Sequence, residues 1–123
     1  MVYRERSLEC PACARTLVDN ADPEGLACRS CGRIFVESAT VQALLEQAMP
    51  DRKFRHALVA FPRDYRDPRV PCPACRELMR AAILFEVAVD QCLDDGFWLA
   101  PDALPQILEN ARARFRARRG LPD

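Results

Sequence analysis

The chain has 123 residues, half of them hydrophobic, and its 18 basic residues balance its 18 acidic residues. Such a composition suits one ordinary globular domain or two very small ones, and it excludes a disordered or fibrous protein. No apolar stretch approaches the roughly 18 residues that a membrane helix needs, and the first residues lack the apolar core of a signal peptide. We therefore expect a cytoplasmic protein with no membrane contact.

The chain contains seven cysteines, which is a high number for its length. Heavy use of cysteine has two common causes, disulfides in small secreted proteins and metal sites in reducing compartments. The odd number of cysteines favours metal, as does the pairing of six of them as Cys-x-x-Cys. A disulfide framework, an iron–sulfur site and a redox Cys-Pro-Ala-Cys of thioredoxin type are the alternatives.

The first predicted element is a zinc ribbon, which with its following helix takes up residues 1–49. Its cysteines have the spacing Cys-x2-Cys-x14-Cys-x2-Cys, which suits four thiolates around one Zn²⁺. The four predicted ligands are Cys10, Cys13, Cys28 and Cys31. Gly32 permits a turn with positive φ beneath the metal, and a hairpin turn is expected between Asp19 and Gly25. A module this small cannot bury enough apolar area alone, so zinc is expected to stabilise it.

A short helix is expected after this ribbon, with Ser38 as its N-cap and Pro50 beyond its end. Its apolar face would carry Val41, Leu44, Leu45 and Ala48. Residues 50–70 then form a linker that is punctuated by prolines. Within it, helical spacing relates Phe54, Ala57, Leu58 and Phe61. The spacing is compatible with a short helix over 51–60, and the alternative is a loosely ordered linker.

The rest of the chain, residues 71–123, repeats the first part. Cys10-Pro11-Ala12-Cys13 recurs as Cys72-Pro73-Ala74-Cys75, and Cys28 recurs as Cys92 at nearly the same offset. The segments that follow also match after a one-residue gap, which indicates a duplication. We therefore predict a small α+β protein with two zinc ribbons. Each ribbon would be a short antiparallel hairpin with cysteine knuckles, followed by an α-helix.

The second ribbon departs from the pattern at its fourth ligand. Its spacing is Cys-x2-Cys-x16-Cys-x2-Asp, with the predicted ligands Cys72, Cys75, Cys92 and Asp95. Because zinc accepts a carboxylate oxygen, we expect a second Zn²⁺ here, and we expect Gly96 to play the part of Gly32 in the turn. The alternatives are a degenerate ribbon without tight metal binding and a site completed by Asp94 or His56.

The second unit resembles a bacterial zinc-finger family named after transcription factor IIB. The matching strings are Pro71-Cys72-Pro73-Ala74-Cys75, Leu78-Met79-Arg80, Val87-Ala88-Val89-Asp90-Gln91-Cys92 and Gly96-Phe97-Trp98-Leu99. The resemblance covers residues 70–110 well and residues 8–48 more weakly. It implies a zinc ribbon, an aromatic-rich segment and a short helix. By resemblance, Asp95 stands at the family's fourth cysteine or histidine, and Ala100 stands at its usual aspartate.

The chain ends in a longer predicted helix, from Asp102 to Arg118. Its apolar stripe would consist of Leu104, Leu108, Ala111 and Phe115. Arginines lie on both sides of this stripe: Arg112, Arg114, Arg116, Arg118 and Arg119. Three interpretations compete: a solvated helix that packs on the ribbon, a helix that binds a partner, and a surface for nucleic acid or a membrane.

The function that these features favour is an interaction or regulatory module that binds a protein partner and contains structural zinc. We expect no enzyme, because the sequence offers no acid/base or nucleophile constellation. The alternative is a transcription-related nucleic-acid-binding protein that uses the five C-terminal arginines. An enzyme would require Asp95 to leave the second zinc and act as a base, although three thiolates lower the Lewis acidity of the ion.

Overall fold

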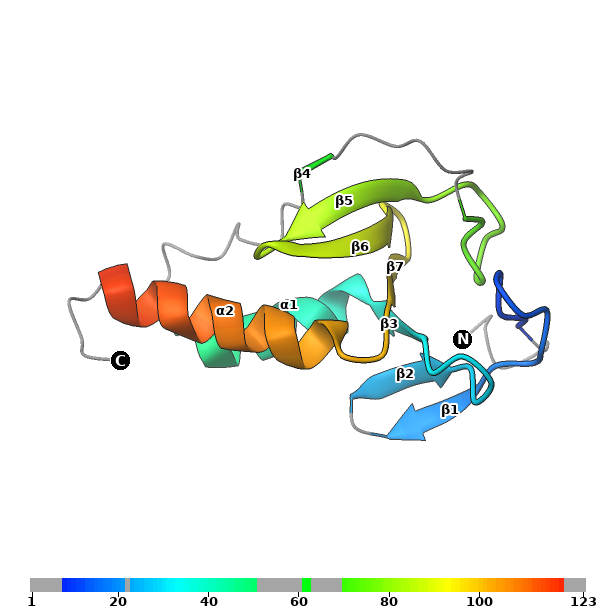
Figure 1. The fold of residues 1–123 in the computed structure, drawn as a ribbon, viewed down its shortest axis with the longest axis horizontal. Helices are drawn as coiled ribbons and strands as arrows, with labels where there is room; N and C mark the ends of the chain where they lie inside the picture. The colour runs from blue at the N-terminus through cyan, green and yellow to red at the C-terminus, as the bar shows by residue number, and fades with distance from the viewer. Residues whose placement is uncertain (1–7, 22, 51–60, 63–69, 119–123) are drawn as a thin grey trace.

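The computed structural model describes residues 8–21, 23–50, 61–62 and 70–118, and it is a small α+β protein (Figure 1). The predicted linker helix over 51–60 and the side chain of His56 lie outside these residues. The strands are β1 (Val18–Ala21), β2 (Glu24–Ala27), β3 (Ile34–Glu37), β4 (Phe61–Pro62), β5 (Arg80–Leu84), β6 (Val87–Cys92) and β7 (Gly96–Leu99). The helices are α1 (Ser38–Ala48) and α2 (Ala103–Arg118).

The order of the elements repeats along the chain. Unit one, residues 8–48, consists of the antiparallel strands β1, β2 and β3 followed by α1. Unit two, residues 70–118, consists of the antiparallel strands β5, β6 and β7 followed by α2. The two-residue β4 pairs with β5 at the edge. The described strands form one seven-stranded sheet in the order β1-β2-β3-β7-β6-β5-β4.

The two units are joined at the centre of this sheet, where β3 pairs antiparallel with β7. The register places Phe35 opposite Trp98. The loop after Cys92 is one residue shorter than the loop after Cys28, so the offset of 64 between these cysteines falls to 63 beyond the loop. Phe35 and Trp98 are therefore counterparts in the duplication. The pairing therefore relates the two units by an approximate twofold axis near Phe35 and Trp98. The sequence did not predict this pairing.

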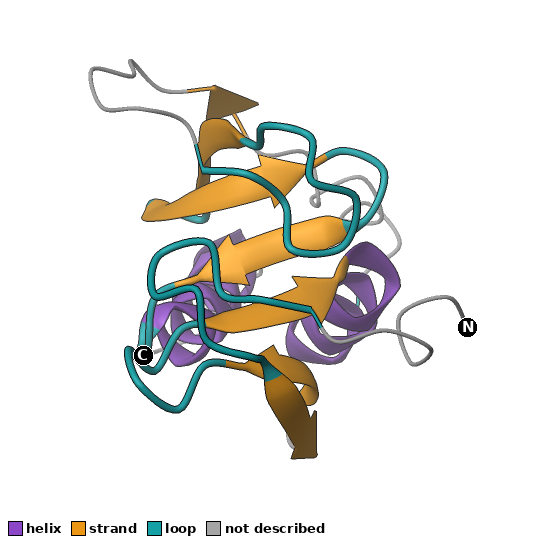
Figure 2. Ribbon diagram, turned by 90° about the vertical axis from the view of Figure 1, so that its right-hand side faces the viewer, coloured by secondary structure: helices purple, strands orange, loops and turns teal. Residues whose placement is uncertain are grey.

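Successive side chains of the central strands point to opposite faces of the sheet, so the core consists of two clusters, one on each face. Val36, Phe97 and Leu99 point to the side of the helices and are fully buried there. Phe35 and Trp98 point to the other side, where they pack with cysteines from both units. Figure 2 shows the helices behind the sheet and the loops of both units in front of it. The helix face supplies the larger apolar core, and the loop face carries the cysteines.

Helix α1 begins differently from the expectation. Ser38 is the first helical residue, Glu37 occupies the N-cap position, and no side chain caps the helix. The backbone N–H of Ser38 instead donates to the carbonyl of Asp95 at 3.2 Å. The prediction of Ser38 as N-cap was wrong because a carbonyl from unit two satisfies this first-turn donor. The buried face of α1 is formed by Val41, Leu45 and Ala48, as the spacing predicted.

Helix α2 starts one residue later than predicted, after Asp102, whose carbonyl accepts from the N–H of Gln106 at 3.3 Å. The helix packs against α1 and β6. Its buried residues are Ala103, Leu104, Ile107 and Ala111, with Leu108 and Phe115 partly buried. The predicted apolar stripe thus faces the core, and Ile107 widens it.

The tip of the β5–β6 hairpin consists of Phe85 and Glu86. Both adopt positive φ, 48° and 70°, and Leu84 pairs with Val87 on either side of them. Such a two-residue turn normally uses Asn or Gly. Here α2 stabilises the turn, since Asn110 donates to the carbonyl of Phe85 at 2.7 Å.

Neither described helix, α1 or α2, has the length and the apolar character of a membrane-spanning segment.

Candidate metal centres

The first knuckle has the same backbone structure in both units. In unit one, Cys10 accepts from the N–H of Ala14 and donates to the carbonyl of Arg15, both at 2.8 Å. In unit two, Cys72 accepts from Arg76 at 2.8 Å and donates to Glu77 at 2.7 Å. The residue after the second cysteine takes a positive φ, 60° at Ala14 and 68° at Arg76. No glycine marks these turns, so local sequence provides no signal of them.

The second knuckle of unit one follows the same pattern. Cys28 donates to the carbonyl of Arg33 and accepts from the N–H of Gly32, both at 2.8 Å. Gly32 has a φ of 78°, which confirms the turn predicted from this glycine. Two knuckles of one geometry therefore approach each other and present four sulfurs to a common point.

These four sulfurs form centre one, which consists of Cys10, Cys13, Cys28 and Cys31. Their Sγ atoms all lie within 4.8 Å of one another. The Sγ atoms of Cys10 and Cys31 are 3.8 Å apart. A tetrahedral ion with Zn–S bonds of about 2.3 Å requires sulfurs roughly 3.8 Å apart. The separation of Cys10 and Cys31 therefore matches that around a tetrahedral metal ion, and the other thiols of the group lie close enough to share it.

The surroundings of centre one shift the pKa values of Cys10 and Cys31 in opposite directions. Burial raises the pKa of Cys10 to about 12, although backbone N–H groups of Cys13 and Ala12 act against it. Burial also acts to raise the pKa of Cys31, but hydrogen bonds from the backbone and side chain of Arg33 prevail and bring that pKa to about 6. The two shifts have opposite directions, so Cys31 gives up its proton more readily than Cys10. A metal that binds all four must release protons.

Centre two consists of Cys72, Cys75, Cys92 and Asp95, whose ligand atoms also lie within 4.8 Å of one another. The Sγ atoms of Cys75 and Cys92 are 3.7 Å apart. Oδ2 of Asp95 lies 3.6 Å from Sγ of Cys72 and 3.5 Å from Sγ of Cys92. Zn–S bonds of about 2.3 Å and a Zn–O bond of about 2.1 Å place sulfur and oxygen roughly 3.6 Å apart in a tetrahedron. The observed separations in centre two therefore also match those around a tetrahedral Zn²⁺.

The turn that presents Asp95 is one residue shorter than its counterpart in unit one. Cys92 pairs directly with Gly96, so three residues form the loop, whereas Cys28 pairs with Arg33 across four residues. Gly96 has no positive φ, and the prediction that it repeats the role of Gly32 was wrong. Its role is close approach, since a Cβ there would lie 2.3 Å from the carbonyl oxygen of Val36 in β3.

The shorter turn and the aspartate compensate each other. A cysteine sulfur is one bond beyond Cβ, and an aspartate oxygen is two bonds beyond it, so a carboxylate reaches farther from its Cα. Asp95 in the shorter turn thereby brings its oxygen to the distance that Cys31 reaches with sulfur in the longer one. Asp94 is exposed and is not part of the group. The other alternative ligand, His56, lies outside the described residues.

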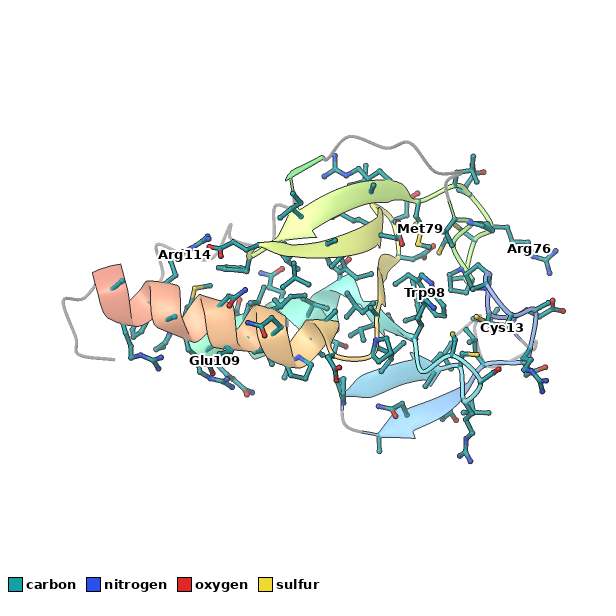
Figure 3. All side chains as sticks on the ribbon, in the orientation of Figure 1. Cys13, Arg76, Met79, Trp98, Glu109 and Arg114 are labelled. Atoms are coloured by element: carbon teal, nitrogen blue, oxygen red, sulfur yellow. The ribbon has the colours of Figure 1, made fainter. Side chains whose placement is uncertain are left out.

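One apolar cluster connects the two centres, and the sequence did not predict it. Its buried members are Leu8, Cys10, Leu17, Cys28, Phe35, Cys72, Ala74, Met79, Cys92 and Trp98. Leu17 and Met79 are counterparts in the repeat, as are Phe35 and Trp98. Figure 3 shows Trp98 beside Met79, between the knuckle of Cys13 and that of Arg76. The two centres therefore share one small core around the central aromatic pair.

Two alternatives for the cysteines do not fit this geometry. All seven cysteines are free, and sulfurs 3.7–3.8 Å apart are too distant for an S–S bond of about 2.05 Å. A thioredoxin-type motif needs its cysteines at the start of a helix, but both Cys-Pro-Ala-Cys strings lie in knuckles between short bridges. The geometry therefore supports neither the disulfide nor the redox interpretation.

The predicted C-terminal arginines are largely engaged within the molecule. Arg112 and Arg116 lie 3.7 and 3.8 Å from the carboxylate of Glu109. Arg114 lies 3.4 Å from Glu86 and stacks over the ring of Phe85 at 4.8 Å. Arg118 ends α2, and Arg119 lies outside the described residues. This geometry favours the interpretation in which α2 packs on its own protein.

No protein-family model, no curated protein and no solved structure matches this chain.

Proposed function

We propose that this chain is a zinc-binding interaction module in which two structural Zn²⁺ ions hold two ribbons that bind a protein partner. The observation that supports it most directly is the spacing of ligand atoms in both centres. Distances of 3.5–3.8 Å are those of a tetrahedron around a single ion. Four ligand atoms that converge on one point are the arrangement that a structural metal site requires.

The donor atoms support zinc as the metal. Four tetrahedral thiolates suit zinc or iron, and a carboxylate oxygen in place of one thiolate is a common zinc ligand. Centre two has this mixed donor set. Each unit would then be a zinc ribbon with its helix, in keeping with the resemblance to the zinc-finger family named after transcription factor IIB.

A structural role for the metal follows from the number of ligands. Four protein ligands fill the coordination shell and leave no position for a substrate or an activated water. The backbone carbonyl of Asp95 is held by the N–H of Ser38, so its side chain is anchored beside the centre. Three thiolates would also lower the Lewis acidity of the ion in centre two. We propose a binding module and not an enzyme.

The surface of unit two supports a protein partner. Leu78 and Leu93 are 60% and 70% exposed, which are the highest values among the exposed large apolar side chains of the described residues. Both belong to the knuckles around centre two. Exposed leucines on both loops of centre two offer apolar area that a protein partner could cover. A carboxylate flanks each leucine, Glu77 and Asp94, and both are exposed.

Native mass spectrometry with metal analysis tests the zinc proposal, and two ions per chain are expected. Cys28→Ser should reduce the number of bound ions to one at most, and zero bound ions in the wild type would contradict the proposal.

Affinity capture with the zinc-loaded chain tests the proposed partner. It should give a reproducible protein that neither Leu78→Asp nor Leu93→Asp retains. The control is Gln47→Asp, which introduces the same side chain at an exposed position of α1.

A further inference from the structure

A shallow groove lies beside centre one, between the two knuckles of unit one. Its volume is about 690 Å³, and its lining residues are Ala14, Arg15, Thr16, Val18, Arg29 and Ser30. The side chains include two guanidinium groups and two hydroxyls, and no carboxylate lines the groove. We call these six residues the arginine groove.

The two arginines of the groove are available to a ligand. Arg15 and Arg29 are exposed, as are Thr16 and Ser30. Within the described part of the chain, neither arginine forms an ion pair, in contrast to the arginines of α2. The arginine that serves the thiolates is Arg33, which hydrogen-bonds to Cys31 and does not line the groove.

The duplication provides an internal control for the meaning of these residues. In the second repeat, Glu77 and Leu78 are the counterparts of Arg15 and Thr16, and Leu93 and Asp94 are those of Arg29 and Ser30. A tetrahedral Zn²⁺ with four anionic ligands carries a formal charge of about −2 in either centre. Unit two has one knuckle arginine, Arg76, at the counterpart of Ala14, and it has Glu77 and Asp94 at two positions of the groove. If the groove arginines only balanced the charge of the metal centre, acidic residues would not be expected at these positions of unit two. The groove has therefore acquired a chemistry that the metal does not require.

We propose that the arginine groove binds a phosphoryl group carried by a side chain of the protein partner. Guanidinium groups bind phosphate oxygens through paired, charge-assisted hydrogen bonds, and arginine clusters are the usual means of recognising phosphorylated segments. The hydroxyls of Thr16 and Ser30 supply further donors at the same groove. This inference rests on the proposed function, because it names the chemistry by which a partner is recognised.

The remaining surface favours a phosphorylated protein segment over a nucleic acid. A polyanionic strand would meet Glu77 and Asp94 in unit two, whose loops face the same side of the sheet as the groove (Figure 2). Single-strand binding usually relies on aromatic rings for stacking, and in the described part of the loop face the aromatic residues of the cluster, Phe35 and Trp98, are buried. A protein segment can place one phosphoryl group in the groove and apolar side chains against Leu78 and Leu93.

The test uses the full zinc-loaded chain and amide chemical shifts from NMR. Four probes are titrated: a leucine- and lysine-containing peptide with one phosphoserine, the same peptide without phosphate, inorganic phosphate, and a single-stranded oligonucleotide. The phosphorylated peptide should shift amides of residues 14–18 and 29–30 and bind at least about tenfold more tightly than its unphosphorylated form. Inorganic phosphate should shift the same amides at higher concentration.

Variants locate the binding. Arg29→Gln should weaken the phosphopeptide about tenfold, as expected for the loss of a charge-assisted contact, and Arg15→Gln should do the same if Arg29→Gln folds poorly. Arg76→Gln removes an exposed knuckle arginine of unit two and should change nothing. Equal binding of both peptides, an equal loss in Arg76→Gln, or tighter binding of the oligonucleotide would each overturn the inference. Zinc content measured on the same sample separates outcomes: two bound ions with an empty groove reject only the groove, and absent zinc rejects the proposed function.

Discussion

Centre one and centre two are two solutions to the same geometric problem. Centre one uses four sulfurs from two knuckles of one design, with the residue after the second cysteine at positive φ in each. Centre two keeps the first of these knuckles and replaces the second by a shorter turn that ends in Asp95. The ligand atoms nevertheless reach similar separations, 3.8 Å in one centre and 3.5–3.7 Å in the other.

This contrast shows that ligand identity and turn length have to be considered together. An aspartate at a cysteine position suggests a damaged site when only the sequence is compared. In the structure, the longer side chain makes up for the missing residue of the turn. Cys75 in centre two is exposed, whereas Cys13 in centre one is half-buried, so centre two is the more accessible of the two.

The largest difference between the centres should appear when one ligand is removed from each. Cys28→Ser should abolish zinc in centre one and the cooperative unfolding of the chain. Structural zinc contributes on the order of 10–16 kcal/mol of apparent binding energy, which exceeds the stability of most small domains. Asp95→Ala removes one ligand of centre two and should weaken zinc binding there alone. Metal analysis with circular dichroism measures both, and an identical loss of structure in the two variants would contradict the comparison.

The shared core predicts that the centres are coupled through Trp98. Trp98→Ala should destabilise the protein by about 3–5 kcal/mol, the usual cost of truncating a buried aromatic residue. It should also accelerate zinc removal by a colorimetric chelator from both centres. Phe97→Ala is the matched control, because Phe97 is also buried but points to the helix face. If both variants accelerate zinc release to the same degree, the loop-face cluster does not couple the centres.

The compensation between Asp95 and its turn can be broken and restored. Asp95→Cys should bind the second zinc about tenfold more weakly than the same variant with a glycine inserted after position 95, a difference of ~1.4 kcal/mol. The insertion recreates the four-residue loop found between Cys28 and Arg33. In the single substitution the loop stays one residue shorter, so the cysteine sulfur does not reach the position of the metal. Competition with a chelator of known affinity measures the ratio. Equal affinities would show that turn length is irrelevant.

A smaller effect is expected at the hairpin tip of unit two. Glu86→Gly should stabilise the protein by about 1 kcal/mol, because glycine adopts a φ of 70° without strain. The lost ion pair with Arg114 is exposed and contributes little to stability.

Asn110→Ala should instead destabilise the protein by about 1 kcal/mol, since it removes the hydrogen bond to the carbonyl of Phe85. Thermal unfolding measures both, and a destabilising Glu86→Gly would contradict the account of this turn.

Local sequence patterns were enough to predict the α+β class, the positions of both helices and the eight residues that the structure gathers into two groups. Two residues between paired cysteines bring both side chains to one tight turn, and apolar residues at helical intervals mark a buried face. The expected turn at Gly32 belongs to the same category. Each could be predicted because residues close in the chain decide it.

The way the units combine depends on packing across the whole fold. The pairing of β3 with β7 joins residues far apart in the chain, and no local pattern specifies such a register. That pairing makes Gly96 a site of close approach, gives Ser38 a partner in unit two and builds one core from Phe35 and Trp98. The ion pair between Arg114 of α2 and Glu86 of the β5–β6 hairpin likewise depends on packing. Long-range contacts such as these are selected by the burial of both sheet faces, which becomes visible only in the folded chain.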